Sequence, residues 1–174
     1  MLSEKMLSAL NKQINYEFEA AYRYLSIAAY AELANLNGAA KFFRIQAQEE
    51  LAHAMKLFDY VVTRRDAEVD LLPIGKPDKK PTSLREAFEM SLASEQGVTK
   101  SIRQLLTQAH DERDYATANV LDWFADEQAE EESLMQGILD RLKLVGDDGT
   151  GLLLIDRELG ERTAEAGGAD SGEE

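Results

Sequence analysis

The sequence predicts an all-α protein: a four-helix bundle with one long crossover and a short fifth helix. Three observations support this fold class. The 174-residue chain has only three prolines, all within residues 73–81, so long stretches can be helical. Apolar residues recur three and four positions apart in four long segments. Apolar residues make up 44% of the chain, which is enough for a sizeable core.

The four amphipathic segments span about residues 3–35, 39–66, 83–110 and 114–144. As helices of about 28–32 residues they would each be roughly 42–48 Å long, a length typical of bundles. The stretch NLNG ends the first segment, with Gly38 as a turn or cap residue. Ser83 and Glu86 stand at capping-box spacing where the third segment begins.

The connections indicate how the segments are arranged. Short turns make the first and second segments antiparallel neighbours, and likewise the third and fourth. Residues 67–82 could extend over roughly 53–58 Å, enough for a crossover along the whole bundle. The apolar stretch GLLLIDRELGER at 151–162 predicts a short helix that docks on a neighbouring subunit. The expected units are a bundle at 1–145, a turn and fifth helix at 146–162, and a disordered acidic tail at 163–174.

The composition excludes several classes of function. With 33 acidic and 19 basic residues the net charge is −14, which argues against a nucleic-acid partner and suits solubility or the attraction of cations. The absence of cysteine excludes disulfides and thiolate metal sites. No apolar run reaches the roughly 18–20 residues of a membrane span, and the N-terminal stretch lacks a signal-peptide core. We therefore expect a cytoplasmic protein without a membrane partner.

An acidic residue interrupts the apolar stripe of each long segment near its middle. In the second segment, for example, Glu50 shares a face with Ala47, Ala54 and Leu57. Mid-helix positions of aligned helices meet at one level of a bundle, so the four acids should converge, with His53 one turn beyond Glu50. The four interrupting acids are Glu17, Glu50, Glu95 and Glu131.

Four carboxylates buried at one level would repel one another without water to solvate them. No lysine or arginine lies on the stripes to neutralise them, and protonating several would destabilise the core at neutral pH. Two divalent cations would resolve the conflict, with the imidazole of His53 completing one site. A single such glutamate is usually a misjudged helix face or a snorkelling side chain, but four in phase are hard to explain in that way.

These motifs resemble the ferritin-like di-iron bundles, in which two helices each supply a Glu and the others a Glu-x-x-His. Glu-Leu-Ala-His at 50–53 is one such motif, whereas the fourth segment has Gln-Ala-Glu-Glu at 128–131. That departure resembles the prokaryotic non-haem ferritins. The resemblance covers about residues 3–160. It rests on NYEFEAAYRYL, AQEELAHAMKLFDYV and LDWFADEQAEEESLM.

The resemblance implies a ferroxidase centre. Glu17, Glu50 and His53 resemble the first iron site, and Glu50 would bridge to a second iron held by Glu95 and Glu131. The resemblance further implies that Gln128 lies near the second iron and that Tyr24 is a candidate electron donor. Trp123 matches an aromatic residue near the same centre. An additional iron site would be formed by Glu49, Glu127 and Glu130. Core packing of the two aromatic residues and a solvated acidic face at Glu127 and Glu130 are the alternatives.

No haem is expected. Bacterioferritin has a second Glu-x-x-His, which this sequence lacks, and Leu51 occupies the position of its haem-ligating methionine.

The resemblance implies iron storage and detoxification. Fe²⁺ would be oxidised to Fe³⁺ by O₂ or peroxide, and ferric oxide mineral would collect inside a hollow shell of 24 subunits, with the fifth helix at a symmetry axis. Two other functions stay open: a di-metal oxidoreductase acting on peroxide or an organic substrate without storage, and a purely structural shell subunit.

Overall fold

The computed structural model describes residues 2–77 and 79–163, so almost all of the expected acidic tail lies outside the described residues. Within them every regular element is helical, which confirms the all-α fold class. The elements are α1 (Glu4–Leu33), α2 (Asn37–Asp59), the π-helical η1 (Tyr60–Arg64), α3 (Leu84–Asp111), α4 (Tyr115–Val145) and α5 (Gly149–Glu161).

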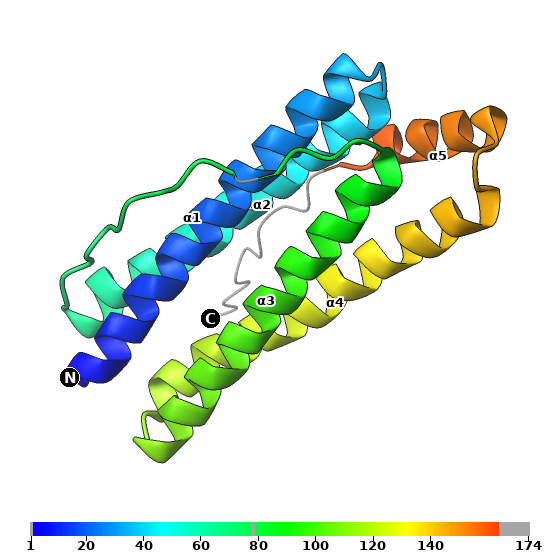
Figure 1. Ribbon diagram of the computed structural model, residues 1–174. Coiled ribbons are helices and arrows are strands. Elements are labelled where there is room, and N and C mark those ends of the chain that lie inside the picture. The colour runs from blue at the N-terminus through cyan, green and yellow to red at the C-terminus, as the bar shows by residue number, and fades with distance from the viewer. Residues whose placement is uncertain (1, 78, 164–174) are drawn as a thin grey trace, which may run out of the picture.

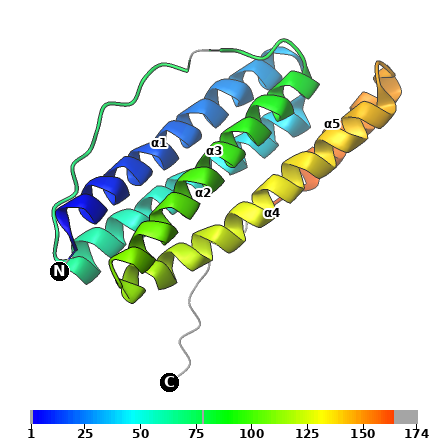
Figure 2. The same ribbon diagram turned by 60° about the horizontal axis from the view of Figure 1, so that its bottom comes forward.

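The helices pack as two antiparallel pairs, α1 with α2 and α3 with α4 (Figure 1). The connection from η1 to α3 contains no helix or strand among its described residues. Both views show it running along the bundle, so α2 and α3 point in the same direction (Figures 1 and 2). This is the predicted bundle with one long crossover. No helix in the described part of the chain has the length and apolarity needed to cross a membrane.

Hydroxyl groups cap two of the long helices. Ser3 Oγ accepts a hydrogen bond of 2.9 Å from the amide of Met6, which starts α1. Ser83 Oγ accepts one of 3.0 Å from the amide of Glu86, as its spacing predicts. The carboxylate of Glu86 does not accept the second capping-box hydrogen bond, which would come from the amide of Ser83. It accepts instead from the amide of Thr82 at 2.7 Å, so only half of the predicted capping box forms.

The prediction for Gly38 was wrong. The turn between α1 and α2 uses Asn35, whose φ is 57°, whereas Gly38 lies within α2. A Cβ atom on Gly38 would lie 1.6 Å from the carbonyl oxygen of Asp156 in α5, so glycine is needed for close helix approach. Asp156 also accepts hydrogen bonds from the amides of Gly38 (3.2 Å) and Ala39 (2.8 Å), and so caps α2.

The fifth helix docks on its own bundle, whereas the sequence suggested a neighbouring subunit. Ile155 and Leu159 are buried in the apolar cluster at that end of the bundle, and Leu152 packs against its edge. The side chains of Leu153 and Leu154 point outward and are 63% and 57% exposed. One face of α5 is therefore satisfied within the chain, and a second apolar face is left at the surface.

The core is divided into two apolar clusters. One surrounds Phe43 and Phe88 near α5, and the other surrounds Ile14, Leu57 and Phe124 towards the opposite end. The acids of the four stripes fall between these clusters in the chain. Apolar packing therefore stabilises both ends of the bundle and leaves a polar layer in the middle.

Candidate metal centre

Each long helix contributes one buried acid to this middle layer. The helical period turns each acid inward with its apolar neighbours, as Glu95 lies inward with Ser91 and Val98 on α3. The exposed fractions are 0%, 1%, 0% and 5% for Glu17, Glu50, Glu95 and Glu131. The sequence prediction of four inward acids therefore agrees with the structure.

Three side chains form a compact group of ligand atoms. One atom each from Glu17, Glu50 and His53 lies within 4.8 Å of the others. His53 Nδ1 is 3.7 Å from Glu50 Oε2. Among the described residues, both oxygens of Glu50, Glu17 Oε2 and His53 Nδ1 are buried without a hydrogen-bond partner. Buried polar atoms are normally satisfied, so this donor set fits a divalent cation bound by two carboxylates and an imidazole.

The other two acids are held by hydrogen bonds. Glu95 accepts one from the hydroxyl of Tyr24 and one of 3.1 Å from Gln128 Nε2. Glu131 accepts a hydrogen bond of 3.0 Å from Gln46 Nε2. These carboxylates lie beside Glu50 and act on it electrostatically, but they are not in the compact group. The structure therefore assembles the first predicted site more tightly than the second.

Burial makes the layer costly to ionise. It raises the pKa of Glu17 and Glu50 well above the usual range, and neighbouring carboxylates (Glu50 for Glu17, Glu95 for Glu50) raise them further. Burial also raises the pKa of Glu95, against the hydrogen bonds from Tyr24 and Gln128. For Glu131, burial and the charge of Glu95 raise the pKa to about 7. Bound cations would favour the charged forms and reverse this cost.

Two arginines lie nearer this layer than the stripes suggested. The charge of Arg23 lowers the pKa of Glu50 and Glu95, and that of Arg162 lowers the pKa of Glu131. In each case the effect of burial is larger. Arg23 itself donates a hydrogen bond of 3.2 Å to Ser94. These arginines partly offset the repulsion between the buried carboxylates.

Aromatic rings surround the centre. The His53 ring contacts Trp123 and Phe124, with centroid distances of 5.6 and 5.9 Å. The ammonium of the exposed Lys56 lies 3.7 Å from the centroid of the Trp123 ring. Tyr24 is buried beside Phe43, and burial together with Glu95 raises its pKa well above the usual range. Both aromatic residues named from the sequence therefore lie next to the acid layer.

The acids of the predicted third site are more scattered. Glu49 binds Arg162, with Nη2–Oε2 at 3.0 Å. Glu127 Oε1 is 3.9 Å from His53 Nε2, and Glu130 is exposed. They do not form a compact ligand group within the part of the chain that the structure describes. A third site there stays a prediction.

Besides Arg23, sequence reasoning missed three side chains that act on the acids. Gln13 donates a hydrogen bond of 2.8 Å to Glu17, as Gln46 does to Glu131. Both glutamines stand four residues before a stripe acid (Gln13 before Glu17, Gln46 before Glu50), so their position on the inward face was a usable signal. Arg162 had no such signal, because it follows α5 and reaches the layer only through the docking of that helix.

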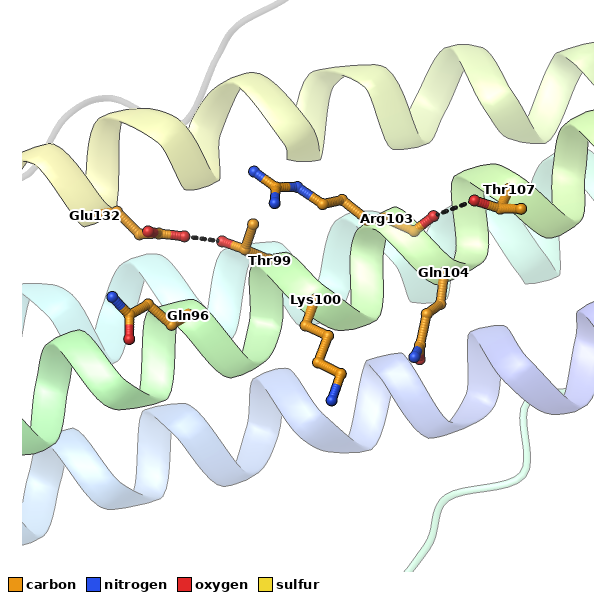
Figure 3. A pocket seen from close by; sticks show the side chains of 7 residues that line it. All are labelled: Gln96, Thr99, Lys100, Arg103, Gln104, Thr107 and Glu132. Carbon is orange, nitrogen blue, oxygen red and sulfur yellow. Dashed lines mark hydrogen bonds between the residues drawn. The ribbon is translucent and has the colours of Figure 1, made fainter.

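A surface hollow lies elsewhere on the bundle. It measures about 500 Å³ on the surface of α3 and α4, and Figure 3 shows Glu132 on α4 and its other labelled side chains on α3. Its lining includes two cations, Lys100 and Arg103, and one acid, Glu132, to which Thr99 donates a hydrogen bond. No residue of the buried acid layer lines it. The hollow is therefore separate from the candidate metal centre.

Comparison with known proteins agrees with the geometry. A family model described as the ferritin-like domain matches residues 7–145, most of the chain. The chain belongs to the ferritin family. This ferritin is 40% identical over 163 residues to the bacterial non-heme ferritin of Staphylococcus aureus strain USA300, covering 94% of this chain and 98% of the relative. It is 42% identical over 164 residues to that of Staphylococcus haemolyticus, with the same coverage.

Solved structures show the same likeness. The open pore ferritin of the archaeon Archaeoglobus fulgidus superposes on this ferritin with a TM-score of 0.91 and 44% sequence identity, over 94% of this chain and all of the other. A humanized archaeal ferritin gives 0.92 and 44%, over 95% and 99%. The fold class and the family expected from the sequence are both confirmed.

Proposed function

We propose that this ferritin stores iron and oxidises Fe²⁺ to Fe³⁺ within the bundle. One observation carries the proposal: Glu17, Glu50 and His53 converge in the core with ligand atoms that lack hydrogen-bond partners among the described residues. A buried group of this kind needs a cation. Iron here is the substrate and then the stored cargo. Family membership supports the choice of iron.

The proposed roles follow the position of each side chain. Glu17 and His53 bind the first Fe²⁺, and Glu50 bridges to a second Fe²⁺ that Glu95 and Glu131 also bind. For this, Glu95 and Glu131 rotate away from the hydrogen bonds that now hold them. Hard oxygen ligands favour Fe³⁺ over Fe²⁺ and so promote loss of an electron. The paired ions pass two electrons to one O₂, which takes up two protons to become hydrogen peroxide.

Neighbouring groups assist at the second ion. Gln128 lies within hydrogen-bond distance of Glu95 and is placed to orient this carboxylate or an oxygen ligand. Tyr24, which donates to the same carboxylate, is the candidate electron donor. The additional iron site at Glu49, Glu127 and Glu130 would receive iron that leaves the centre. The proposed function requires no haem.

Storage requires an enclosed space that one bundle lacks. We infer a hollow shell of 24 copies, as the family resemblance implies, in a cytoplasmic setting. The exposed Leu153 and Leu154 on α5 support a contact between copies at a symmetry axis. The net charge of −14 would draw iron towards the shell.

Stepwise iron loading tests the proposal. Fe²⁺ is added to metal-free protein in air, free iron is removed by gel filtration, and iron per chain is counted with the particle mass. We expect tens to hundreds of irons per chain in a very large particle. Saturation near two irons per chain in a small oligomer would favour the oxidoreductase alternative.

A pair of variants tests the centre itself. Glu50→Ala should abolish rapid Fe²⁺ oxidation and leave assembly intact, because it removes the proposed bridge. Asp59→Ala, an exposed acid on the same helix, is the matched control and should oxidise iron normally. If Glu50→Ala oxidises Fe²⁺ at the same initial rate as the wild type, the site assignment is contradicted. If both proteins oxidise Fe²⁺ equally slowly, the structural-subunit alternative is favoured.

A further inference from the structure

Arg162 occupies a built site beside the acid layer. It follows α5, and its guanidinium donates from Nη2 to both oxygens of Glu49, at 3.0 and 3.3 Å. Nη1 donates to Gln46 Oε1, and Cζ lies 4.9 Å from the Phe42 ring centroid. The side chain is only 19% exposed. An arginine bound on three sides and mostly covered is held far more firmly than a surface ion pair.

Gln46 connects this arginine to the centre. Its side chain is fully buried, and its Nε2 donates a hydrogen bond of 3.0 Å to Glu131. An amide has one acceptor oxygen and one donor nitrogen on opposite sides. When Arg162 binds the oxygen, the nitrogen is directed towards Glu131. The arginine therefore sets the direction of a hydrogen bond on a proposed iron ligand without touching that ligand.

The same guanidinium competes for Glu49. This acid belongs to the additional iron site that the sequence suggested, yet both of its oxygens already face a positive charge. A metal ion bound to these oxygens would lie within a few ångströms of the guanidinium, and like charges at that distance repel strongly in a partly buried site. Glu49 can bind a metal ion well only after Arg162 moves away.

We propose that Arg162 is a built-in cation that takes the place of a third metal ion at Glu49 and positions Gln46 against Glu131. The chain then fills its central pair of metal positions first, and a third divalent ion binds only when the end of α5 releases the guanidinium. This inference rests on the proposed function for the identity of the central pair. It makes the C-terminal end of α5 a regulator of how many ions each subunit holds.

Zinc binding to metal-free assembled protein tests the proposal without redox chemistry. Zn²⁺ is titrated by calorimetry and its positions are located by anomalous diffraction. Arg162→Gln removes the charge and keeps most of the side-chain length. We expect affinity for a Zn²⁺ ion at Glu49 to rise on the order of tenfold or more. Adding Glu49→Gln should remove the gain.

The matched control is Arg157→Gln, on α5 just before Arg162. Arg157 is 80% exposed and forms an ion pair of 3.7 Å with Glu161, which is 70% exposed, so the variant loses the same charge at the surface. It should bind Zn²⁺ like the wild type. Arg162→Lys retains the charge and should bind the ion at Glu49 more weakly than Arg162→Gln does. Circular dichroism and particle mass verify that each variant is folded and assembled.

The outcomes separate this inference from the proposed function. Zn²⁺ affinity at Glu49 within twofold of wild type in Arg162→Gln would overturn the competition. Equal gains in Arg162→Lys and Arg162→Gln, or in Arg157→Gln, would overturn the role of this particular charge. Failure of wild type to bind Zn²⁺ at Glu17, Glu50 and His53 would instead contradict the proposed function.

Discussion

The hydroxyl of Tyr24 donates a hydrogen bond to Glu95 inside the bundle, joining α1 to α3. Both side chains are almost completely buried, at 1% and 0% exposed. The bond stabilises the charged carboxylate and so counters the rise in the pKa of Glu95 that burial causes. Tyr24 therefore supports the acid layer whether or not it transfers an electron.

Removing this hydroxyl should make binding at the centre more sensitive to acid. In Tyr24→Phe the pKa of Glu95 rises further, because the charged carboxylate loses a hydrogen bond that favours it. The pH at which half of the Zn²⁺ dissociates should therefore move upward. Calorimetric titration with Zn²⁺ across a pH series measures this. Tyr22→Phe, which removes a half-exposed hydroxyl from the same helix, should leave the midpoint unchanged. Identical midpoints in both variants would contradict the role of the bond.

Metal-free protein should become less stable as the pH rises. The pKa of Glu131 is raised from 4.5 to about 7 on folding, so between these values the folded chain holds a proton that the unfolded chain has lost. This bound proton stabilises the folded chain fully at low pH, and its contribution to the free energy of unfolding is lost as the pH rises through 7. The loss is about 3 kcal/mol for Glu131 alone. Glu17 and Glu50 act in the same direction, because their pKa values are also raised.

Urea unfolding of metal-free protein between about pH 5 and 8 measures this dependence. Glu131→Gln should reduce the slope and be more stable than wild type at the alkaline end. Zn²⁺ should restore wild-type stability there, since a ligand that binds only the folded state stabilises it. A stability that rises with pH in metal-free wild type would refute the electrostatic description of the layer.

Gly38→Ala should release α5 from the bundle. The new methyl group would overlap the backbone of Asp156, and backbone cannot move aside as a flexible side chain does. We expect a loss of about 1–3 kcal/mol, with the apolar face of Ile155 and Leu159 partly exposed. Thermal unfolding and protease sensitivity of the C-terminal region measure the effect.

Gly137→Ala provides the opposite control. Gly137 lies in α4 with nothing within 4 Å of a new Cβ, so alanine should stabilise that helix by about 1 kcal/mol. If the two substitutions changed stability in the same direction, close approach between α2 and α5 would not be the reason for glycine at position 38.

The sequence was most informative where the physical signal is local. Helical periodicity predicted that Glu17, Glu50, Glu95 and Glu131 face inward, and each of them is buried. Helix ends were less predictable. The second segment was expected to run to residue 66, but α2 ends at Asp59 and η1 continues as a π-helix to Arg64. Tyr60 in that turn shares a hydrogen bond of 2.8 Å with Thr117 on α4, a distant contact that local spacing cannot reveal.

The sequence by itself determined that four long amphipathic helices would each place an acid in one layer, with His53 one turn from Glu50. It could do so because helix period and chain length are properties of the chain alone. Only the tertiary structure decided which groups bind these acids and their neighbour Glu49: Tyr24 and Gln128 on Glu95, Gln46 on Glu131, and Arg162 on Glu49. These contacts depend on how closely separate helices approach, and above all on the docking of α5 against α2. That docking is a property of packing between distant segments, which no spacing within the sequence records.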